Sequence, residues 1–133
     1  MKKKDYPSWL VPLKLSKELK NIGFKIKSCF YYSFEDSALF VYSKPENYNK
    51  KCNEEIFVTI PTWEQVFEWF RRKGLFHSIC FTEDLIEEVK GFEIEIRDNN
   101  ADIIHILHQD TYERAMEAVV KKLIEIYGDN INI

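Results

Sequence analysis

The segment "IPTWEQVFEWFRRKG", residues 60–74, constrains the fold more than any other part of this chain. Pro61 ends a preceding strand, and Thr62 with Gln65 three residues later forms a capping-box pattern that starts a helix. Large apolar residues follow at the i, i+3, i+4, i+7 spacing of a single helix face, namely Trp63, Val66, Phe67 and Phe70. Gly74 ends the predicted helix. The pattern therefore predicts a buried helix near the middle of the chain.

Segments with the composition of β-strands lie on both sides of this helix. They cover residues 24–34, 38–43, 56–60, 75–81, 92–97 and 102–108. Residues 92–97 alternate cleanly, with Phe92, Ile94 and Ile96 on one face, so we expect a sheet with one solvated face. Residues 82–91 fit either a short helix or an irregular connection, and we leave both open.

Two further helices lie near the ends of the chain. Residues 13–22 carry apolar side chains at helical spacing, and Gly23 follows as the stop. Asp110 with Glu113 forms a capping pattern for a second helix, and we expect Gly128 to end it. The element order α-β-β-β-α-β-β-β-α predicts an α+β fold, in which two or three helices cover an antiparallel sheet of about five to six strands.

Length and charge limit the remaining possibilities. A chain of 133 residues predicts a single domain, residues 1–133, with a loosely ordered N-terminal segment 1–9 and a polar surface loop 44–55. The net charge of −3 provides no general attraction to nucleic acid or to an anionic membrane. No apolar run has the length of a signal peptide or a membrane span, so we expect a cytoplasmic protein.

Cysteine and histidine patterns predict no metal site and no nucleophile. His105 and His108 are three apart on a strand, which places them on opposite faces, and the same applies to His77 and Cys80. We expect Cys80 to be a small core residue and the three cysteines, Cys29, Cys52 and Cys80, to be unpaired.

Other catalytic patterns give no candidate either. Glu93 and Glu95 share a strand face at a spacing compatible with acid–base work, but a solvated strand face explains them as well. The chain has neither a GxxxxGK[ST] nor a GxGxxG motif, which excludes the nucleotide-binding enzymes that use them. We therefore predict no catalytic residue, no cofactor and no enzyme activity.

Nucleic-acid binding is the main alternative. The order α-β-β-β-α of the second half is that of the double-stranded RNA-binding domain. That family places lysines at the start of its second helix to hold phosphates, whereas this chain has Asp110 and Glu113 there. Whether basic clusters such as residues 71–73 and 121–122 converge into a patch is left open.

Two segments resemble a widespread group of small uncharacterised proteins from phages, prophages and mobile elements of gut-type bacteria. The first match consists of Pro61, Thr62, Trp63, Gln65, Val66, Trp69, Phe70 and Arg71. The second consists of Tyr112, Ala115, Val119, Leu123 and Ile124, and residues 19–32 resemble the opening of the same group. The resemblance implies an accessory protein that acts by binding to a host factor, a phage protein or itself.

The C-terminal half of the central helix supplies the candidate contact. Trp69 lies off the main apolar stripe, beside Arg71, Arg72 and Lys73. Aromatic and arginine side chains are enriched at protein interfaces. We therefore predict an interaction surface at these four residues, with Trp69 either partly buried by neighbouring sheet residues or in a contact with a partner. The expected function is protein binding or self-association, including a homodimer, without enzyme activity and without membrane contact.

Overall fold

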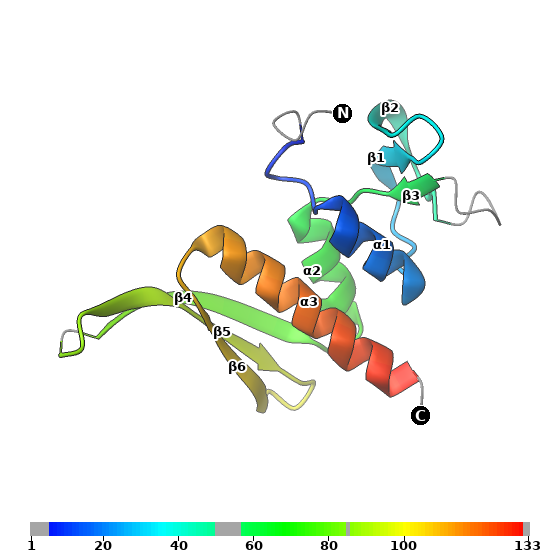
Figure 1. Ribbon diagram of the computed structural model, residues 1–133. Coiled ribbons are helices and arrows are strands. Elements are labelled where there is room, and N and C mark those ends of the chain that lie inside the picture. Colours follow the sequence, from blue (N-terminus) through cyan, green and yellow to red (C-terminus); the bar gives the residue numbers. More distant parts are fainter. Residues whose placement is uncertain (1–5, 50–56, 85, 132–133) are drawn as a thin grey trace. The chain divides into compact units, whose positions relative to one another are not determined.

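A computed structural model of the protein describes residues 6–49, 57–84 and 86–131 (Figure 1). Its elements occur in the predicted order α-β-β-β-α-β-β-β-α, which confirms the α+β class. They are α1 (Leu13–Asn21), β1 (Ser28–Ser33), β2 (Ala38–Glu46), β3 (Phe57–Thr59), α2 (Trp63–Arg72), β4 (Phe76–Asp84), β5 (Val89–Arg97), β6 (Ile103–Gln109) and α3 (Tyr112–Ile131).

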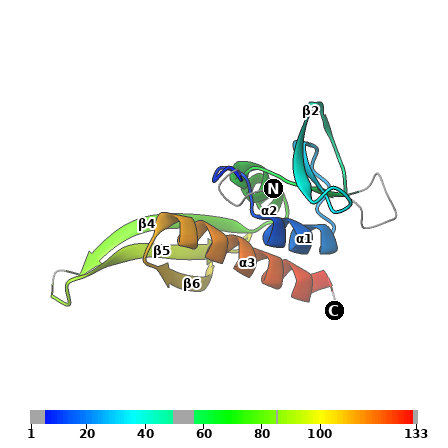
Figure 2. The same ribbon diagram turned by 45° about the horizontal axis from the view of Figure 1, so that its top comes forward.

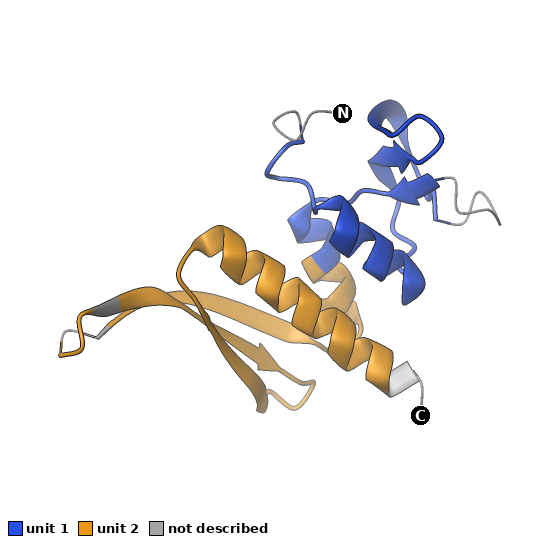
Figure 3. Ribbon diagram, in the orientation of Figure 1, with its two compact units in different colours: residues 1–66 blue, residues 67–133 orange. Residues whose placement is uncertain are grey.

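The strands form two antiparallel sheets of three strands each, and the expectation of a single sheet was wrong. β1 lies between β2 and β3 in the first sheet, and β5 lies between β4 and β6 in the second. The chain correspondingly divides into two compact units, residues 1–66 and 67–133, with the boundary inside α2 (Figure 3). Alternation along a strand identifies its faces but not its neighbours, which is why the sequence did not separate the sheets. Whether residues 1–133 unfold as one domain stays a prediction.

Unit 1 has its core between the first sheet and the segment that precedes α1. Leu10, Val58 and Ile60 are almost completely buried at its centre. Partly buried apolar side chains surround them, namely Tyr6, Leu13, Phe30, Tyr32, Phe34 and Leu39. In the sheet, Tyr32 lies between Leu39 of β2 and Val58 of β3. This register places the even-numbered residues of β1 on the core face and Tyr31 on the opposite face.

The end of α1 explains why β1 starts later than predicted. The backbone N–H of Gly23 donates to the Lys20 carbonyl, and that of Phe24 donates to the Leu19 carbonyl. Gly23 has φ +91°, the left-handed conformation that such a helix stop requires. Phe24 is buried as part of this stop. The first strand consequently begins at Ser28 and not at residue 24.

The described parts of the N-terminal segment and of the polar loop make specific backbone contacts. The Tyr6 hydroxyl donates to the Val11 carbonyl, and Leu10 forms a β-bridge with Thr62. These contacts hold the described part of the predicted loose segment 1–9, whose residues 1–5 lie outside the described residues. In the predicted loop 44–55, β2 continues to Glu46 and the Tyr48 N–H donates to Thr59 Oγ1 at 2.8 Å; residues 50–55 lie outside the described residues.

Both predicted ends of α2 are confirmed. The Thr62 N–H donates to Gln65 Oε1 at 2.9 Å, and the Gln65 N–H donates to Thr62 Oγ1 at 3.2 Å, which is a reciprocal capping box. Gly74 has φ +84°, and the Leu75 N–H donates to the Phe70 carbonyl at 2.9 Å. Val66 and Phe70 of the predicted stripe are fully buried.

Unit 2 is built on a long hairpin of β4 and β5, which Figure 2 shows beside α3. The paired residues extend from Phe76 opposite Arg97 to Asp84 opposite Val89. Apart from Leu85, which lies outside the described residues, residues 82–91 are therefore the ends of two strands and the turn between them, and neither the short helix nor the irregular connection was right. Glu, Leu and Lys in this segment favour a helix locally, but the cross-strand pairing outweighs that preference.

Helix α3 was predicted with two errors at its ends. The N-cap is Thr111, whose Oγ1 accepts from the Arg114 N–H at 3.2 Å, whereas Asp110 forms an ion pair with the Arg114 side chain. The helix continues past Gly128 to Ile131. Gly128 is not among the glycines with positive φ, so it does not form a left-handed stop. A glycine inside a helix costs only about 1 kcal/mol, which continued helical hydrogen bonding offsets.

Candidate protein-interaction surface

The predicted surface on α2 contains one buried and three more accessible side chains. Trp69 is only 8% exposed, and its ring meets those of Phe70 and Tyr127 edge to face, with 5.0 Å between centroids in each case. Its predicted burial is confirmed, but the ring from another element belongs to α3 and not to the sheet. The Lys73 ammonium lies 5.2 Å from the centroid of the Trp69 ring. Trp69 is thus part of the packing of unit 2.

The two arginines beside Trp69 differ in exposure. Arg72 is exposed and its Nη2 lies 2.8 Å from Glu68 Oε1, one helical turn earlier. Arg71 is half-buried. Exposed i,i+4 ion pairs contribute only about 0.3–0.5 kcal/mol, so this pair leaves Arg72 accessible to a partner. A partner contact through Trp69, Arg71, Arg72 and Lys73 stays a prediction.

The second sheet has one face covered by α3. Ile94 and Ile96 of β5 are fully buried, and so are four residues of α3: Ala115, Val119, Val120 and Leu123. Helix α3 contacts β5 and β6 (Figures 1 and 2). The face that carries Ile94 and Ile96 is therefore the core face, as the alternation of residues 92–97 predicted.

The opposite face of this sheet is solvated and carries a row of charged side chains along its central strand. Glu93, Glu95 and Arg97 lie on this face of β5, and Arg97 Nη2 is 3.0 Å from Glu95 Oε2. Cys80 pairs with Glu93 from the β4 side and is exposed, so the expectation that it is a core residue was wrong. Both sequence neighbours of Cys80 are apolar. However, side chains alternate between the two faces of a strand, and Cys80 lies on the same face as the solvated positions of β5.

The edge strand β6 exposes more apolar surface than its sequence led us to expect. Ile103 is 44% exposed, Ile104 37% and Ile106 49%. Ile106 lies opposite Glu95 and therefore on the solvated face. The register shifts between Ile96 and Arg97, because Ile96 pairs with His105 and Arg97 with Ile103. Ile104 is the extra residue of this bulge, and the bulge leaves Ile103 and Ile104 both exposed. We call these three residues the isoleucine edge.

A signal for the isoleucine edge was present in the sequence. Residues 103–107 are apolar in both phases of the strand, in contrast to the clean alternation of residues 92–97. A strand with one solvated face needs apolar residues in only one phase. The second apolar phase therefore marked residues that the core of unit 2 does not bury.

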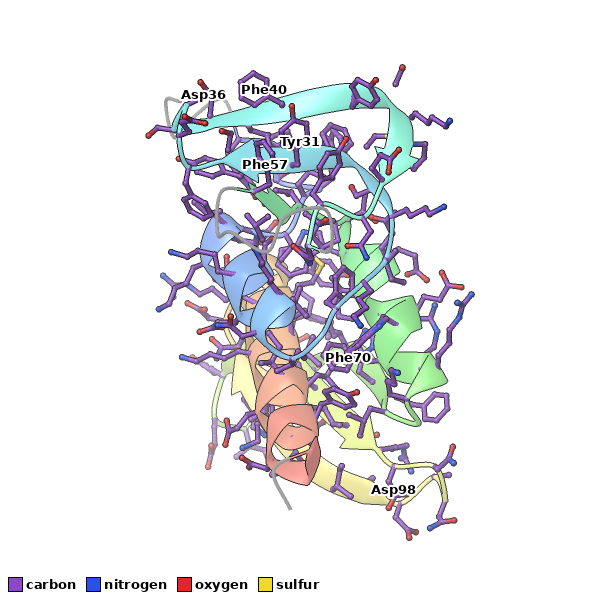
Figure 4. The ribbon with its side chains drawn as sticks, turned by 90° about the vertical axis from the view of Figure 1, so that its right-hand side faces the viewer. Tyr31, Asp36, Phe40, Phe57, Phe70 and Asp98 are labelled. Atoms are coloured by element: carbon purple, nitrogen blue, oxygen red, sulfur yellow. The ribbon has the colours of Figure 1, made fainter. Side chains whose placement is uncertain are left out.

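An aromatic cluster lies on the face of the first sheet that is opposite the core of unit 1. Tyr31 stacks on Tyr48 and on Phe40, with ring centroids 4.2 and 5.5 Å apart, and meets Phe57 edge to face at 5.4 Å. Figure 4 shows Tyr31, Phe40 and Phe57 together on this sheet. Burial, followed by the nearby phenol of Tyr31, raises the pKa of Tyr48 above its ordinary value. Tyr31 thus contacts the other three rings of this cluster.

The residues considered for catalysis do not converge in the described part of the chain. His105 and His108 lie opposite Ile96 and Glu93, and hence on opposite faces of the sheet. Among the described residues, no group of three or more His, Cys, Asp and Glu side chains is arranged to hold a metal ion. Cys29 and Cys80 are free thiols, whereas Cys52 lies outside the described residues.

One cavity in unit 2 contains titratable groups. It has a volume of about 330 Å³ and is lined by Thr82, Lys90, Gly91, Phe92, His108, Gln109 and Asp110. His108 and Asp110 are both exposed, and Asp110 accepts two hydrogen bonds from Arg114 Nη1, at 3.2 and 3.1 Å. These groups are therefore in contact with solvent.

Comparisons with known proteins give no further assignment. The chain matches no protein-family model, and no curated protein and no solved structure matches it. In the part of the chain that the structure describes, no helix is long and apolar enough to cross a membrane.

Proposed function

We propose that this protein is a non-enzymatic, protein-binding accessory protein of a phage or mobile element, and that it binds through the β6 side of its second sheet. The isoleucine edge is the observation that carries this proposal. Ile103, Ile104 and Ile106 are exposed on a strand that no described strand covers on its outer side. Edge strands present unpaired N–H and C=O groups, and proteins that remain monomeric protect such edges.

The energetic argument concerns what a partner gains by covering these residues. Complete burial of an isoleucine side chain contributes about 1.5–3 kcal/mol, and each of the three is roughly half exposed. A strand that pairs with β6 also satisfies its backbone groups, and such strand addition is a common mode of protein recognition. Apolar burial and backbone hydrogen bonding thus both support a partner that adds a strand beside β6.

The proposed source of the protein and its proposed compartment rest on separate observations. The resemblance of residues 61–71 and 112–124 to small phage and mobile-element proteins supports the proposed source. Free thiols at Cys29 and Cys80 are typical of a reducing compartment, and we therefore propose the cytoplasm. The neighbouring genes test the source, because a chain encoded outside phage or mobile-element regions would contradict it.

Site-specific cross-linking tests the binding surface. A photoreactive phenylalanine analogue replaces Ile106 in the organism that encodes the chain, and the same analogue replaces Val41 as a matched control. Val41 is also an exposed β-branched residue on an edge strand, but it lies in unit 1. We expect protein adducts at position 106 and few at position 41. Equal yields at both positions, or none at either, would contradict the proposal.

Nucleic-acid binding remains the second candidate, and it now has support in unit 1 only. Residues 1–66 carry eleven lysines against eight Asp and Glu, a net charge of +3, whereas residues 67–133 carry eight Lys and Arg against fourteen Asp and Glu, a net −6. Unit 2 is the half with the α-β-β-β-α order, yet Asp110 and Glu113 occupy the start of α3. Acidic side chains there repel the phosphates that a double-stranded RNA-binding domain would hold.

A salt titration separates the two candidates. Fluorescence anisotropy is measured with labelled single- and double-stranded RNA and DNA, at salt concentrations from about 50 to 200 mM. Phosphate contacts produce a steep fall in affinity over this range. We expect no salt-dependent binding. Tight binding that weakens steeply with salt, and that is lost when Lys14 and Lys17 of α1 are changed to Glu, would put nucleic acid first.

A further inference from the structure

We infer that the partner at the isoleucine edge is a second copy of this chain, with the two β6 strands paired antiparallel. This inference rests on the function proposed above and names the partner of the same surface. The two sheets β4-β5-β6 would then form one continuous sheet of twice three strands. A two-fold symmetric contact of this kind requires a surface that is complementary to itself.

The sequence of β6 and its flank has this self-complementarity. Residues 102–108 read "DIIHILH", with an apolar pair on each side of the central His105. Antiparallel pairing about His105 places Ile104 of one copy opposite Ile106 of the other, and the symmetry repeats this contact. Cross-strand pairs of β-branched residues each contribute about 0.2–1 kcal/mol.

Other registers give fewer apolar pairs. Pairing about Ile106 places Ile104 opposite His108 of the second copy. Pairing about Leu107 places Ile104 opposite Asp110 and leaves the isoleucines without an apolar partner. The register about His105 is the one of these that places Ile104 opposite Ile106, and this apolar pairing favours it.

A comparison with the other exposed edge strands explains why β6 is the paired one. Strand β2 carries Lys44 and Pro45, which are residues that typically protect an edge from pairing. Strand β4 also exposes Phe76 and Phe81, but it carries Ser78, Cys80 and Thr82 on its solvated side and ends in Glu83 and Asp84. In contrast, β6 contains no lysine, arginine, proline or carboxylate between Ile103 and Gln109.

The bulge at Ile104 does not contradict this pairing. Bulges in edge strands twist the edge and often discourage pairing. Here the bulge leaves both Ile103 and Ile104 exposed next to Ile106, which enlarges the apolar surface. Without a partner, nothing would offset the cost of exposing these apolar side chains to water.

The oligomeric state tests the inference. Sedimentation velocity over a concentration series should give a mass near twice 16.0 kDa for the wild-type chain. Ile106→Lys should weaken the dimer about tenfold or more, because it places an ammonium opposite the isoleucine of the second copy. Ile106→Thr keeps a β-branched residue and should weaken it less, and the control Val41→Lys should leave it unchanged. Circular dichroism verifies that each variant is folded.

Cysteine pairs test the register. In a background with Cys29, Cys52 and Cys80 changed to Ser, one tagged chain carries Ile104→Cys and a differently tagged chain carries Ile106→Cys. Mixing and mild oxidation should cross-link the two tags at least several-fold faster than either chain cross-links to itself. Preferential self-cross-linking of the Ile106→Cys chain would contradict the register about His105.

The outcomes distinguish the inference from the proposed function. A wild-type chain that stays monomeric at every concentration overturns the inference, and so does a dimer that Val41→Lys weakens as much as Ile106→Lys. If such a chain still forms photo-adducts of other masses at position 106, the proposed function stands and only the second copy is excluded. If position 106 gives no adducts at all, both are wrong.

Discussion

Trp69 packs at the basic C-terminal end of α2. Its ring lies between Phe70 and Tyr127, and the Lys73 ammonium lies 5.2 Å above it and 6.0 Å from the centroid of the Tyr127 ring. We predict that Trp69→Ala costs about 3–5 kcal/mol of unfolding free energy, because it leaves a cavity between α2 and α3. Urea denaturation measures the loss. The half-exposed Trp9 provides the control, and a loss from Trp69→Ala no larger than that from Trp9→Ala would contradict the packing role.

Gly23 and Gly74 provide a matched pair for backbone strain. Both have positive φ, but a Cβ at Gly23 meets open space, whereas a Cβ at Gly74 lies 3.3 Å from Asn99 Cγ. We predict that Gly23→Ala costs about 1–2 kcal/mol from the left-handed conformation alone. Gly74→Ala should cost as much and somewhat more. Combining Gly74→Ala with Asn99→Ala should return the loss to that of Gly23→Ala in the same denaturation assay, and an unchanged loss would exclude the Asn99 contact.

At the scale of elements, the dipole of α2 gives a prediction about its arginines. Arg71 and Arg72 lie in its last turn, where positive charge is favourable by about 0.3–1 kcal/mol each. Arg71→Glu with Arg72→Glu should therefore cost about 1–2 kcal/mol, including the exposed pair with Glu68, and should leave the chain folded. Thermal denaturation followed by circular dichroism measures the loss.

The matched control for the α2 double substitution is a charge reversal in the first turn of another helix, α3. Arg114→Glu alters the first turn of α3, where a carboxylate is favoured by the dipole and only an exposed pair with Asp110 is lost. We expect it to cost less than half of the α2 double substitution. Equal losses would mean that the helix dipole does not account for the effect.

The elements also show how far the sequence predicts the fold. Three helix ends were predicted correctly, at Thr62, Gly23 and Gly74, because hydrogen bonds within a few residues decide them. Both ends of α3 were missed. The long β4–β5 hairpin was missed at residues 82–91 because cross-strand pairing, and not the local helix preference of these residues, decides their structure. For the same reason, the sequence did not divide the strands into two sheets.

The candidate site was less predictable than the fold. The sequence led us to Trp69, which the structure buries, and away from Ile106, which it exposes. Composition draws attention to large aromatic and basic residues, but exposure depends on which element covers them. Helix α3 extends past Gly128, and Tyr127 covers Trp69. No described strand pairs with the outer side of β6.

For the whole molecule, the position of the unit boundary inside α2 has a consequence for unfolding. The first residues of α2 belong to unit 1, where Trp63 Nε1 donates to the Ser8 carbonyl at 2.9 Å. The later residues belong to unit 2, where the Phe67 ring lies 4.0 Å from that of His77. Helix formation is cooperative, so loss of either half of α2 weakens the other. We therefore expect the two units to unfold together.

Hydrogen exchange under mildly denaturing conditions tests this coupling. Phe67→Ala removes a buried side chain of unit 2 and should cost about 3–5 kcal/mol, and Val58→Ala removes a smaller one in unit 1. If the units are coupled, each variant speeds exchange in β1 and β5 by the same factor, because both strands then exchange through one global opening. If the units unfold independently, Phe67→Ala affects β5 and spares β1, while Val58→Ala does the reverse. We predict the first result, which would make residues 1–133 a single cooperative domain despite their two sheets.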